Sequence, residues 1–481
     1  MSAPTVRAAA GLVPSRYLLI GDRAYRGPGG GEAWFGYATR TATLIPLDRA
    51  SAEALRSGDP AALAGLGPEE CGRLAALHAL VDREEDELAT VTDGLRTGSA
   101  RGSARSVTIM PTAYCNMACS YCGQEHVKAA HDRERSERVA RRVEAMIADP
   151  AVDTVSVTWF GGEPLLALRV IRELSARFTA AAAAHGTRYT ARMATNGSLL
   201  TVRTLAALHR DCALEEMELT IDGPEEVHDR RRITRNGRGS FRRTVAVLAE
   251  TLAGGLAPGL RVGIRVNIDR GNEDSVTPLL HDLACLGLAH PQVTLHLIAV
   301  HSWGNDVSEV ELAARAYAAR EAEWLRTAEA LGLHFAPLPV ATVRTTCTAT
   351  TRSGEIIDPG GRIYSCSEHP LVPGAGSAGV VAEVADLVGS AARPAGAFDD
   401  WYEQVGAGAA QCSRCPILPV CGGSCPKLWR EGHLPCPSVK FNWAERLDLA
   451  VRRRGFTPLP PGPAHAPEQQ NGEQQDRGQQ W

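Results

Sequence analysis

The stretch SVTIMPTAYCNMACSYC, residues 106–122, joins an apolar, β-branched run to three closely spaced cysteines. The run at 106–112 predicts a buried strand, and Cys115, Cys119 and Cys122 follow in the loop after it. Three thiolates at this spacing can hold three irons of a [4Fe–4S] cube and leave the fourth iron without a protein ligand. Because a substrate or cosubstrate can bind an open iron, the spacing predicts a redox catalyst rather than a structural metal site.

The pattern of a β-branched run followed by a helical stretch repeats along the chain. Helical stretches such as 136–148, 165–184 and 240–253 separate the runs. Six such units predict an α/β fold with a parallel sheet whose inner strands are buried on both faces. Right-handed crossovers curl such a sheet into a partial (β/α)6 barrel, here at 106–335, with its reactive loops at the carboxyl ends of the strands. The predicted strands are 106–112, 154–160, 187–196, 216–222, 261–269 and 292–300.

Polar groups follow each of these strands, as expected for a site at one end of the barrel. After the cysteine loop, the next strands end at Gly161–Pro164, at Asn196 and at Asp222. Asn267 and Asp269 close the fifth strand, and His301 closes the sixth. Because the carboxyl ends of parallel strands share one edge of a sheet, these groups are expected to lie near one another.

The flanking regions differ in composition from the barrel. Residues 1–100 predict a small α+β module, with strands at 16–22, 32–38 and 42–47 before helices at 51–65 and 68–82. TGSARGSARS at 97–106 is typical of a linker. Residues 341–440 predict a C-terminal cysteine-rich Fe–S domain that needs metal to fold. The Pro/Gln-rich residues 457–481 predict a disordered tail.

Charge and hydropathy narrow the class of protein. The 481 residues carry a formal net charge of -4, so no basic excess favours a nucleic-acid or membrane-surface partner. The chain has no apolar run long enough for a membrane span, and its start lacks the apolar region of a secretory signal. We therefore expect a cytoplasmic protein, in which thirteen cysteines favour metal or redox chemistry over disulfides.

Residues 106–440 resemble the radical S-adenosylmethionine (SAM) enzymes, in the branch with a SPASM-type auxiliary-cluster domain. The resemblance implies that Cys115, Cys119 and Cys122 bind the cube and that the amino and carboxylate groups of SAM chelate its open iron. Gly161, Gly162, Glu163 and Pro164 resemble the motif that holds the methionine amino group, with Glu163 adding negative charge. Tyr121 stands where the family places an aromatic residue beside the cluster or adenine. By position, Asn196, Asp222 and Arg232 are candidate ribose or carboxylate contacts; the alternative for each is a capping or turn residue.

Seven distal cysteines match the spacing of the SPASM pattern. They read C-x13-G-x4-C, a gap, C-x2-C-x5-C-x3-C, a gap and C. The resemblance implies one auxiliary Fe–S cluster at Cys347, Cys366 and Cys425, and a second at Cys412, Cys415, Cys421 and Cys436, both expected to be [4Fe–4S]. Zinc is the alternative, although seven cysteines are an awkward number for tetrahedral zinc. The remaining Cys71, Cys212 and Cys285 are expected to be small core hydrophobes.

The first auxiliary cluster lacks a fourth cysteine, because position 353 is Ser. His369, Asp358 and Glu368 are candidates to close it, or the site stays open. Anaerobic sulfatase maturases, one branch of the family, carry an aspartate directly after the second auxiliary cysteine, where it acts as a base. Ser367 stands there in this chain, which weakens that alternative, although Glu368 is a possible substitute. His296, His301 and Trp303 are expected to line the barrel mouth.

SPASM-domain enzymes act mostly on peptides or protein side chains, so the resemblance implies maturation of a ribosomally made precursor peptide. Hydrogen removal followed by oxidation through the auxiliary clusters would form a crosslink, with ferredoxin or flavodoxin as electron donor. Residues 1–100 are either a leader-peptide recognition module or a structural cap. The alternatives are side-chain oxidation of a protein, epimerisation by a thiol such as Cys212 or Cys285, a small-molecule substrate, and a non-catalytic electron carrier or peptide scaffold.

Overall fold

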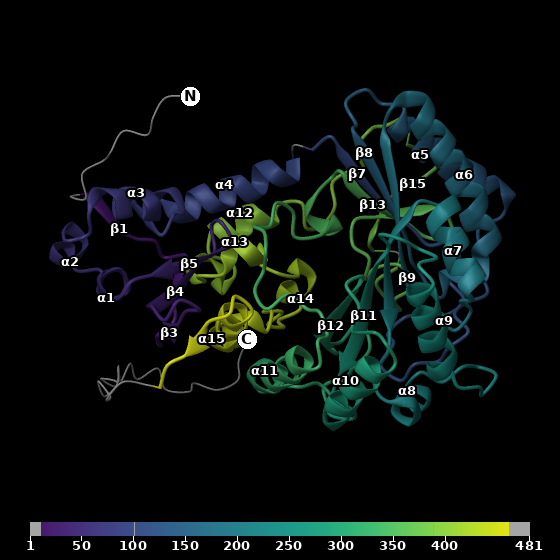
Figure 1. Cartoon of the computed structure of the whole chain (residues 1–481). Helices are drawn as coiled ribbons and strands as arrows, with labels where there is room; N and C mark the ends of the chain where they lie inside the picture. Colours follow the sequence, from purple (N-terminus) through teal and green to yellow (C-terminus); the bar gives the residue numbers. More distant parts are fainter. Residues whose placement is uncertain (1–10, 101, 377, 388, 461–481) are drawn as a thin grey trace. The chain divides into compact units, whose positions relative to one another are not determined.

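The structure, a computed structural model, describes residues 11–100, 102–376, 378–387 and 389–460, which divide into two units (Figure 1). The barrel unit consists of Leu95–Phe335 and Arg344–Tyr402. The terminal unit consists of the described parts of Met1–Gly94, Ala336–Val343 and Glu403–Trp481.

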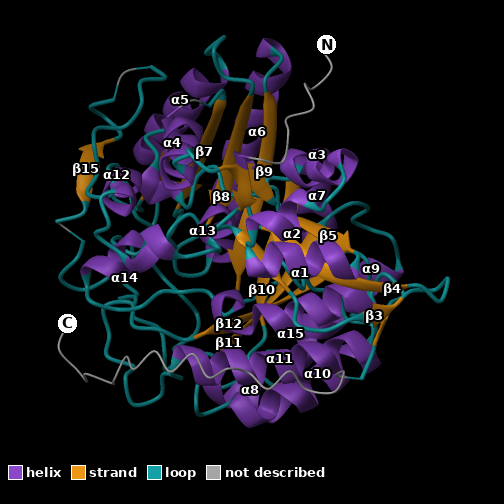
Figure 2. Ribbon diagram, turned by 90° about the vertical axis from the view of Figure 1, so that its left-hand side faces the viewer, coloured by secondary structure: helices purple, strands orange, loops and turns teal. Residues whose placement is uncertain are grey.

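The core of the barrel unit is a nine-stranded sheet in the order β12-β11-β10-β9-β8-β7-β13-β14-β15. Its first six strands are all parallel, which confirms the predicted α/β fold with a parallel sheet. Figure 2 shows these strands in orange. The six are β7 (Ala104–Ile109), β8 (Thr154–Trp159), β9 (Arg188–Thr195), β10 (Leu214–Thr220), β11 (Arg261–Ile268) and β12 (Val293–Ala299).

The strands bury one face completely and the other only in part. On β8, Val155, Val157 and Trp159 are inaccessible to solvent, whereas the alternate Ser156 and Thr158 are half-buried. The expectation of strands buried on both faces is therefore wrong in this respect, because the inward side chains line cavities. Figure 1 shows α5, α6, α7 and α9 along the outer face of the sheet. The helices of this unit are α5 (Arg133–Ile147), α6 (Leu168–His185), α7 (Val202–Asp211), α8 (Glu225–Arg231), α9 (Phe241–Ala253), α10 (Val276–Cys285) and α11 (Ala314–Ala330).

Local sequence explains where these helices begin and end. The Asp132 carboxylate accepts a hydrogen bond from the Arg135 backbone N–H and so caps the start of α5. Gly186, with φ of 73°, ends α6 in the left-handed conformation that glycine adopts without strain. Short 3-10 turns cover Pro164–Ala167, Glu273–Ser275 and Thr348–Thr350.

Part of the predicted cysteine-rich domain extends the barrel sheet. Strand β13 (Gly354–Ile357) pairs in parallel with β7, and β14 (Arg362–Tyr364) and β15 (Val380–Glu383) continue it antiparallel. The structure thus divides the chain differently from the predicted boundary at 341, because a sheet edge shared with β7 joins 344–402 to the barrel. A buried ion pair between Arg142 of α5 and Glu355 of β13, with N···O of 2.9 Å, ties the extension to a barrel helix.

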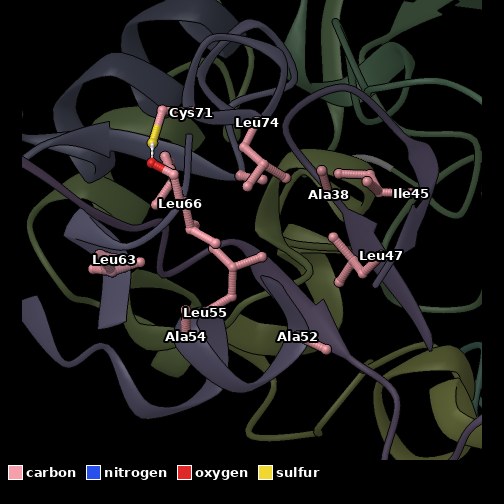
Figure 3. Packing of buried hydrophobic residues seen from close by; sticks show 12 residues of the cluster. Ala38, Ile45, Leu47, Ala52, Ala54, Leu55, Leu63, Leu66, Cys71 and Leu74 are labelled. Atoms are coloured by element: carbon pink, nitrogen blue, oxygen red, sulfur yellow. Dashed lines mark hydrogen bonds between the residues drawn. The ribbon is translucent and has the colours of Figure 1, made fainter. Parts of the chain in front are cut away.

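The terminal unit combines small sheets with short helices. Strand β4 lies at the centre of its larger sheet, and Tyr25, Phe35, Tyr37 and Leu447 pack in one of its cores. Figure 3 shows the other core, in which Cys71 donates to the Leu66 carbonyl at 3.6 Å. The strands of the terminal unit are β1 (Leu12–Pro14), β2 (Leu18–Ile20), β3 (Tyr25–Arg26), β4 (Glu32–Ala38), β5 (Thr43–Leu47), β6 (Leu80–Asp82) and β16 (Thr457–Pro458). Its helices are α1 (Arg49–Ser57), α2 (Pro60–Ala64), α3 (Pro68–Ala76), α13 (Leu418–Cys421), α14 (Pro426–Arg430) and α15 (Val439–Arg452), with a 3-10 turn at Gln411–Arg414; α4 (Glu87–Ala100) and α12 (Trp401–Gly406) cross the unit boundaries.

Three predictions for this part of the chain were wrong at their edges. Residues 80–82 form strand β6, paired with β1, rather than the end of a helix. The expected linker at 97–106 begins inside α4 and ends inside β7, leaving a short connection. Thr457–Pro458 pair with β3 as β16, whereas 461–481 of the predicted tail lie outside the described residues.

No helix in the described part of the chain is long and apolar enough to cross a membrane.

Candidate functional site

A cavity of about 200 Å³ opens in the barrel unit at the carboxyl ends of the parallel strands. It brings Cys115, Cys119 and Cys122 together with residues that follow four other strands. Of the predicted site residues, the ones that line it are Cys115, Cys119, Tyr121, Cys122, Gly161, Gly162, Asn196, Arg232, His301 and Trp303.

The three cysteines sit in surroundings suited to an iron–sulfur cluster. All three are free thiols, and burial raises the pKa of Cys115 to about 11 and that of Cys122 above its usual value. A raised pKa disfavours the thiolate, and a bound metal compensates the charge of a buried thiolate. Asn196 Nδ2 lies 3.8 Å from Cys115 Sγ, and His126 Nε2 lies 3.6 Å from Cys122 Sγ. The donor set therefore fits the three-cysteine cluster.

The two glycines bring their loop against the cysteine loop. Gly161 has φ of 118°, in the region that favours glycine. A Cβ at Gly162 would lie 2.3 Å from the Tyr114 carbonyl oxygen, a distance that no side chain permits. The backbone N–H of Gly162 donates to Thr112 O and that of Glu163 donates to Tyr114 O. Glycine is thus required for close packing of the two loops.

Glu163 does not point into the cavity. Its side chain is fully buried and accepts hydrogen bonds from Leu165 N, Thr195 Oγ1 and Asn196 N, at 3.0, 2.7 and 2.8 Å. Burial raises the pKa of this carboxyl group. Glu163 was expected to add negative charge at the methionine amino group, and this prediction is corrected. Its hydrogen bonds connect the loop after β8 to the end of β9. Pro164 begins the 3-10 turn behind it and also lies outside the cavity lining.

Tyr121, Asp222 and Arg232 form one hydrogen-bonded network. The Tyr121 hydroxyl donates to Asp222 Oδ2, accepts from an Arg232 guanidinium N–H and accepts from Asn267 Nδ2 at 3.2 Å. Burial raises the pKa of Tyr121 well above its usual value. Asp222 is inaccessible to solvent, and its other oxygen accepts from Asn267 N, so it orients neighbours rather than facing the cavity. Arg232 reaches the cavity, and its buried Nε has no hydrogen-bond partner among the described residues.

Sequence reasoning missed three polar side chains that the strands themselves contribute to the cavity lining. Glu218 and Thr220 of β10 and Arg265 of β11 line the cavity, beside Asn267, which was expected at this end of the fifth strand. Arg265 donates to Asn267 Oδ1 at 2.8 Å and to Glu218 Oε1 at 3.4 Å. The signal was present as charged residues at alternate positions of two strands, which face one side of a sheet.

His301 and Trp303 line the cavity as predicted, and Trp303 Nε1 donates to His301 Nε2 at 2.5 Å. Glu368 Oε1 lies 3.7 Å from the same His301 nitrogen. His296 does not lie at the barrel mouth. It lies in a separate cavity of about 450 Å³, with its Nδ1 3.8 Å from Glu218 Oε2. The correction follows from its position in the middle of β12.

The three side chains considered as a fourth ligand of the first auxiliary cluster have different surroundings. Asp358 is buried and accepts from Gly360 N, Arg362 N and the Arg362 guanidinium, so it is a turn residue rather than a free ligand. Glu368 lies close enough to Cys347 that its charge adds to the burial that raises the pKa of that thiol. His369 packs its ring on Phe398, with centroids 5.9 Å apart. Cys366 packs with Ala349 and Phe398.

Four distal cysteines gather around one small cavity in the terminal unit. Cys412, Cys415, Cys421 and Cys436 line a space of about 20 Å³. Burial raises the pKa values of Cys412 and Cys421 to about 12. These are the four cysteines expected to hold the second auxiliary cluster, and that assignment stays a prediction. Cys425 lies in the same unit, whereas Cys347 and Cys366 belong to the barrel unit, so the ligand set of the first auxiliary cluster stays a prediction.

The remaining cysteines do not line the barrel cavity. Cys71 and Cys212 are buried, which confirms their expected role as core residues. Cys285 is exposed at the end of α10, so that prediction was wrong for it. Among the described residues, no thiol other than the three clustered cysteines lines the barrel cavity.

Residues 109–283 match the model of the Radical SAM superfamily. The chain carries a radical SAM domain. An uncharacterized protein of Synechocystis sp. is 30% identical over 155 residues, which cover 30% of this chain and 37% of that protein, so the match spans well under half of the relative.

Solved structures share the fold of the radical SAM domain and its flanks. The structure of anSMEcpe with bound AdoMet covers 73% of this chain and 98% of its own, with a TM-score of 0.53 and 14% identity. The structure of anSMEcpe with AdoMet and the Kp18Cys peptide has a TM-score of 0.54 and 16% identity over the same shares. Streptococcus suis SuiB bound to its precursor peptide SuiA covers 89% of this chain and 98% of its own, at 15% identity and a TM-score of 0.43. At these identities, the likeness to anSMEcpe is one of fold.

Proposed function

We propose that this chain is a radical SAM maturase that modifies a ribosomally made peptide. One observation carries the proposal: Cys115, Cys119 and Cys122 line a single cavity with Gly161, Gly162, Asn196 and Arg232 at the carboxyl ends of the strands. When bound, a [4Fe–4S] cluster and SAM supply a 5′-deoxyadenosyl radical that takes hydrogen from the substrate.

The residues around the cavity position these groups. The three cysteines hold the cluster, and Asn196 donates toward the sulfur of Cys115. The backbone of Gly161 and Gly162 borders the space for the methionine part of SAM, while Arg232 offers a charge for its carboxylate. Tyr121 stays oriented through Asp222 and Asn267. Trp303 and His301 line the same cavity and are proposed to limit the access of water to it.

The distal cysteines are proposed to hold two auxiliary clusters. Cys412, Cys415, Cys421 and Cys436 supply four ligands to one, and their convergence on one cavity supports this assignment. Cys347, Cys366 and Cys425 are the proposed ligands of the other. Ferredoxin or flavodoxin is the proposed electron donor, and the cytoplasm is the proposed compartment.

The proposed substrate is a precursor peptide. A protein of similar fold, anSMEcpe, has been solved with AdoMet and a peptide, which motivates the proposal. The peptide would lose two hydrogen atoms, one to the adenosyl radical and one as a proton and an electron, as a carbon–carbon, carbon–sulfur or carbon–oxygen crosslink forms. The described part of residues 1–100 is a candidate recognition module for its leader.

Anaerobic co-expression with each short open reading frame beside the gene tests this function. We expect one peptide to lose the mass of two hydrogens, and fragmentation to locate the new bond. An unchanged mass with one deuterium gained in heavy water would instead indicate epimerisation. No change in any peptide would contradict peptide maturation and favour a protein or small-molecule substrate. Absence of SAM cleavage in the fully reduced protein would favour an electron carrier or scaffold.

Oxidation of a protein side chain is the second candidate. The Glu368 carboxylate lies 3.7 Å from His301 at the cavity and close to Cys347, where it can accept the proton that such an oxidation releases. If this candidate holds, Glu368→Gln slows product formation at least tenfold while SAM cleavage without substrate is unchanged. Equal product rates in the two proteins would exclude this role for Glu368.

A further inference from the structure

The small cavity between the distal cysteines has one charged side chain in its lining besides the thiols. Lys440 reaches it from the first turn of α15, while the other lining residues are apolar or uncharged, including Ile417, Leu418 and Trp429. Lys440, the four cysteines and these neighbours all belong to the terminal unit.

The Lys440 ammonium is directed at sulfur. Its Nζ lies 3.4 Å from Cys436 Sγ, within hydrogen-bond distance for a sulfur acceptor. No carboxylate of the described residues forms an ion pair with Lys440, in contrast to Lys427, which pairs with Glu431 at 2.7 Å. The ammonium therefore contacts the sulfur of Cys436 and lies over the Phe441 ring, 5.7 Å from its centroid, rather than pairing with a carboxylate.

We propose that Lys440 raises the reduction potential of the auxiliary cluster held by Cys412, Cys415, Cys421 and Cys436. The inference rests on the proposed function, in which these cysteines bind a cluster. Reduction adds one negative charge to a cluster, and a nearby cation stabilises the reduced form more than the oxidised form. A hydrogen bond to a ligating sulfur acts in the same direction, because it withdraws electron density from the sulfur. Lys440 is a positioning and tuning residue, since it acts through the ligands.

A raised reduction potential favours this cluster as an acceptor of electrons. A cluster with a higher potential is reduced more readily by an organic radical, and it releases its electron less readily to a weak acceptor. Lys440 thus favours electron flow from the substrate into the terminal unit during the proposed oxidation.

A redox titration followed by electron paramagnetic resonance tests the inference on the full-length, anaerobically reconstituted protein. The background carries Cys115→Ala, Cys119→Ala and Cys122→Ala, which removes the signal of the SAM-binding cluster. Lys440→Met is expected to keep full iron content and to lower the midpoint potential of one remaining cluster by at least 59 mV, a tenfold change for a one-electron couple. Lys440→Arg, which keeps charge and donor, is expected to restore most of the shift.

Arg452→Met is the matched control, because it removes a positive charge from the far end of the same helix, where Arg452 pairs with Asp448. Its potential is expected to equal that of the parent protein. An unchanged potential in Lys440→Met at full iron content would overturn the inference and leave the cluster assignment intact. Iron content that is unchanged in Cys412→Ala and Cys421→Ala combined would overturn both the cluster assignment and the inference. If Lys440→Met loses iron, Lys440→Gln gives the comparison, and a parent-like potential in that variant would overturn the inference.

Discussion

At the scale of single residues, the site depends on side chains that orient other side chains. Glu163 and Asp222 were expected to contact SAM, yet both are inaccessible to solvent. Their carboxylate oxygens accept hydrogen bonds from backbone N–H groups of neighbouring segments. The sequence predicted part of the cavity lining, including the three cysteines, the two glycines and Asn196, because these residues follow strands. It did not predict which carboxylates face inward, because that depends on hydrogen bonds between loops far apart in the chain.

Replacing Glu163 by Gln tests its orienting role. The amide would place N–H groups against backbone N–H donors, which leaves a buried polar group unsatisfied. We expect the free energy of unfolding in urea to fall by about 1–3 kcal/mol. Glu226→Gln, at an exposed position on α8, is the control and is expected to unfold like the parent. Equal stability of the two variants would contradict the assignment.

His228 gives the barrel unit a dependence on pH. It is fully buried between Asp222 N and Ser240 Oγ, and burial lowers its pKa to about 3. Since the unfolded chain binds this proton near pH 6.5, stability falls as pH drops from there toward 3, by at most about 1.4 kcal/mol per pH unit. Urea unfolding at pH 7, 6 and 5 measures this loss. We expect His228→Gln to lose less stability than the parent over that range; parallel pH profiles would contradict the expectation.

At the scale of elements, the parallel strands were predictable and their extension was not. The β-branched composition of runs such as TVSVTWF and RVGIRVNID predicts strands. The strands Thr154–Trp159 and Arg261–Ile268 lie within these two runs. Strand β13 pairs with β7 although about 250 residues separate them, and nothing in the short run GEII indicates that partner. Long-range pairing of this kind is decided by packing rather than by local pattern.

Removing the ion pair between Arg142 and Glu355 tests how strongly this pair holds β13 to α5. Arg142→Met leaves a buried carboxylate without its cation, so we expect a loss of about 3–5 kcal/mol in unfolding free energy. The double variant Arg142→Met with Glu355→Met removes both charges and is expected to recover the part of the loss that comes from the unpaired carboxylate, while the hydrogen bonds of Arg142 to Gly389 O and Ala391 O stay lost. A double variant as unstable as the single one would show that the charges are not coupled.

At the scale of the whole molecule, the sequence predicted three consecutive modules, whereas the described residues divide into two units whose segments alternate along the chain. The cysteine pattern read as one domain contributes Cys347 and Cys366 to one unit and Cys412 to Cys436 to the other. Composition could not show this division, because a cysteine-rich stretch with few regular elements carries little periodic signal. Each unit nevertheless contains a group of cysteines that line one cavity.

The most direct measurement is the amount of 5′-deoxyadenosine formed from SAM by the reduced, iron-reconstituted protein without oxygen. We predict that the parent protein forms it, that Cys285→Ala does so equally, and that the combined Cys115→Ala, Cys119→Ala and Cys122→Ala variant forms none. Formation that survives the triple substitution, or no formation by a parent protein with full iron content, would contradict the assignment of the barrel cavity as the site of radical chemistry.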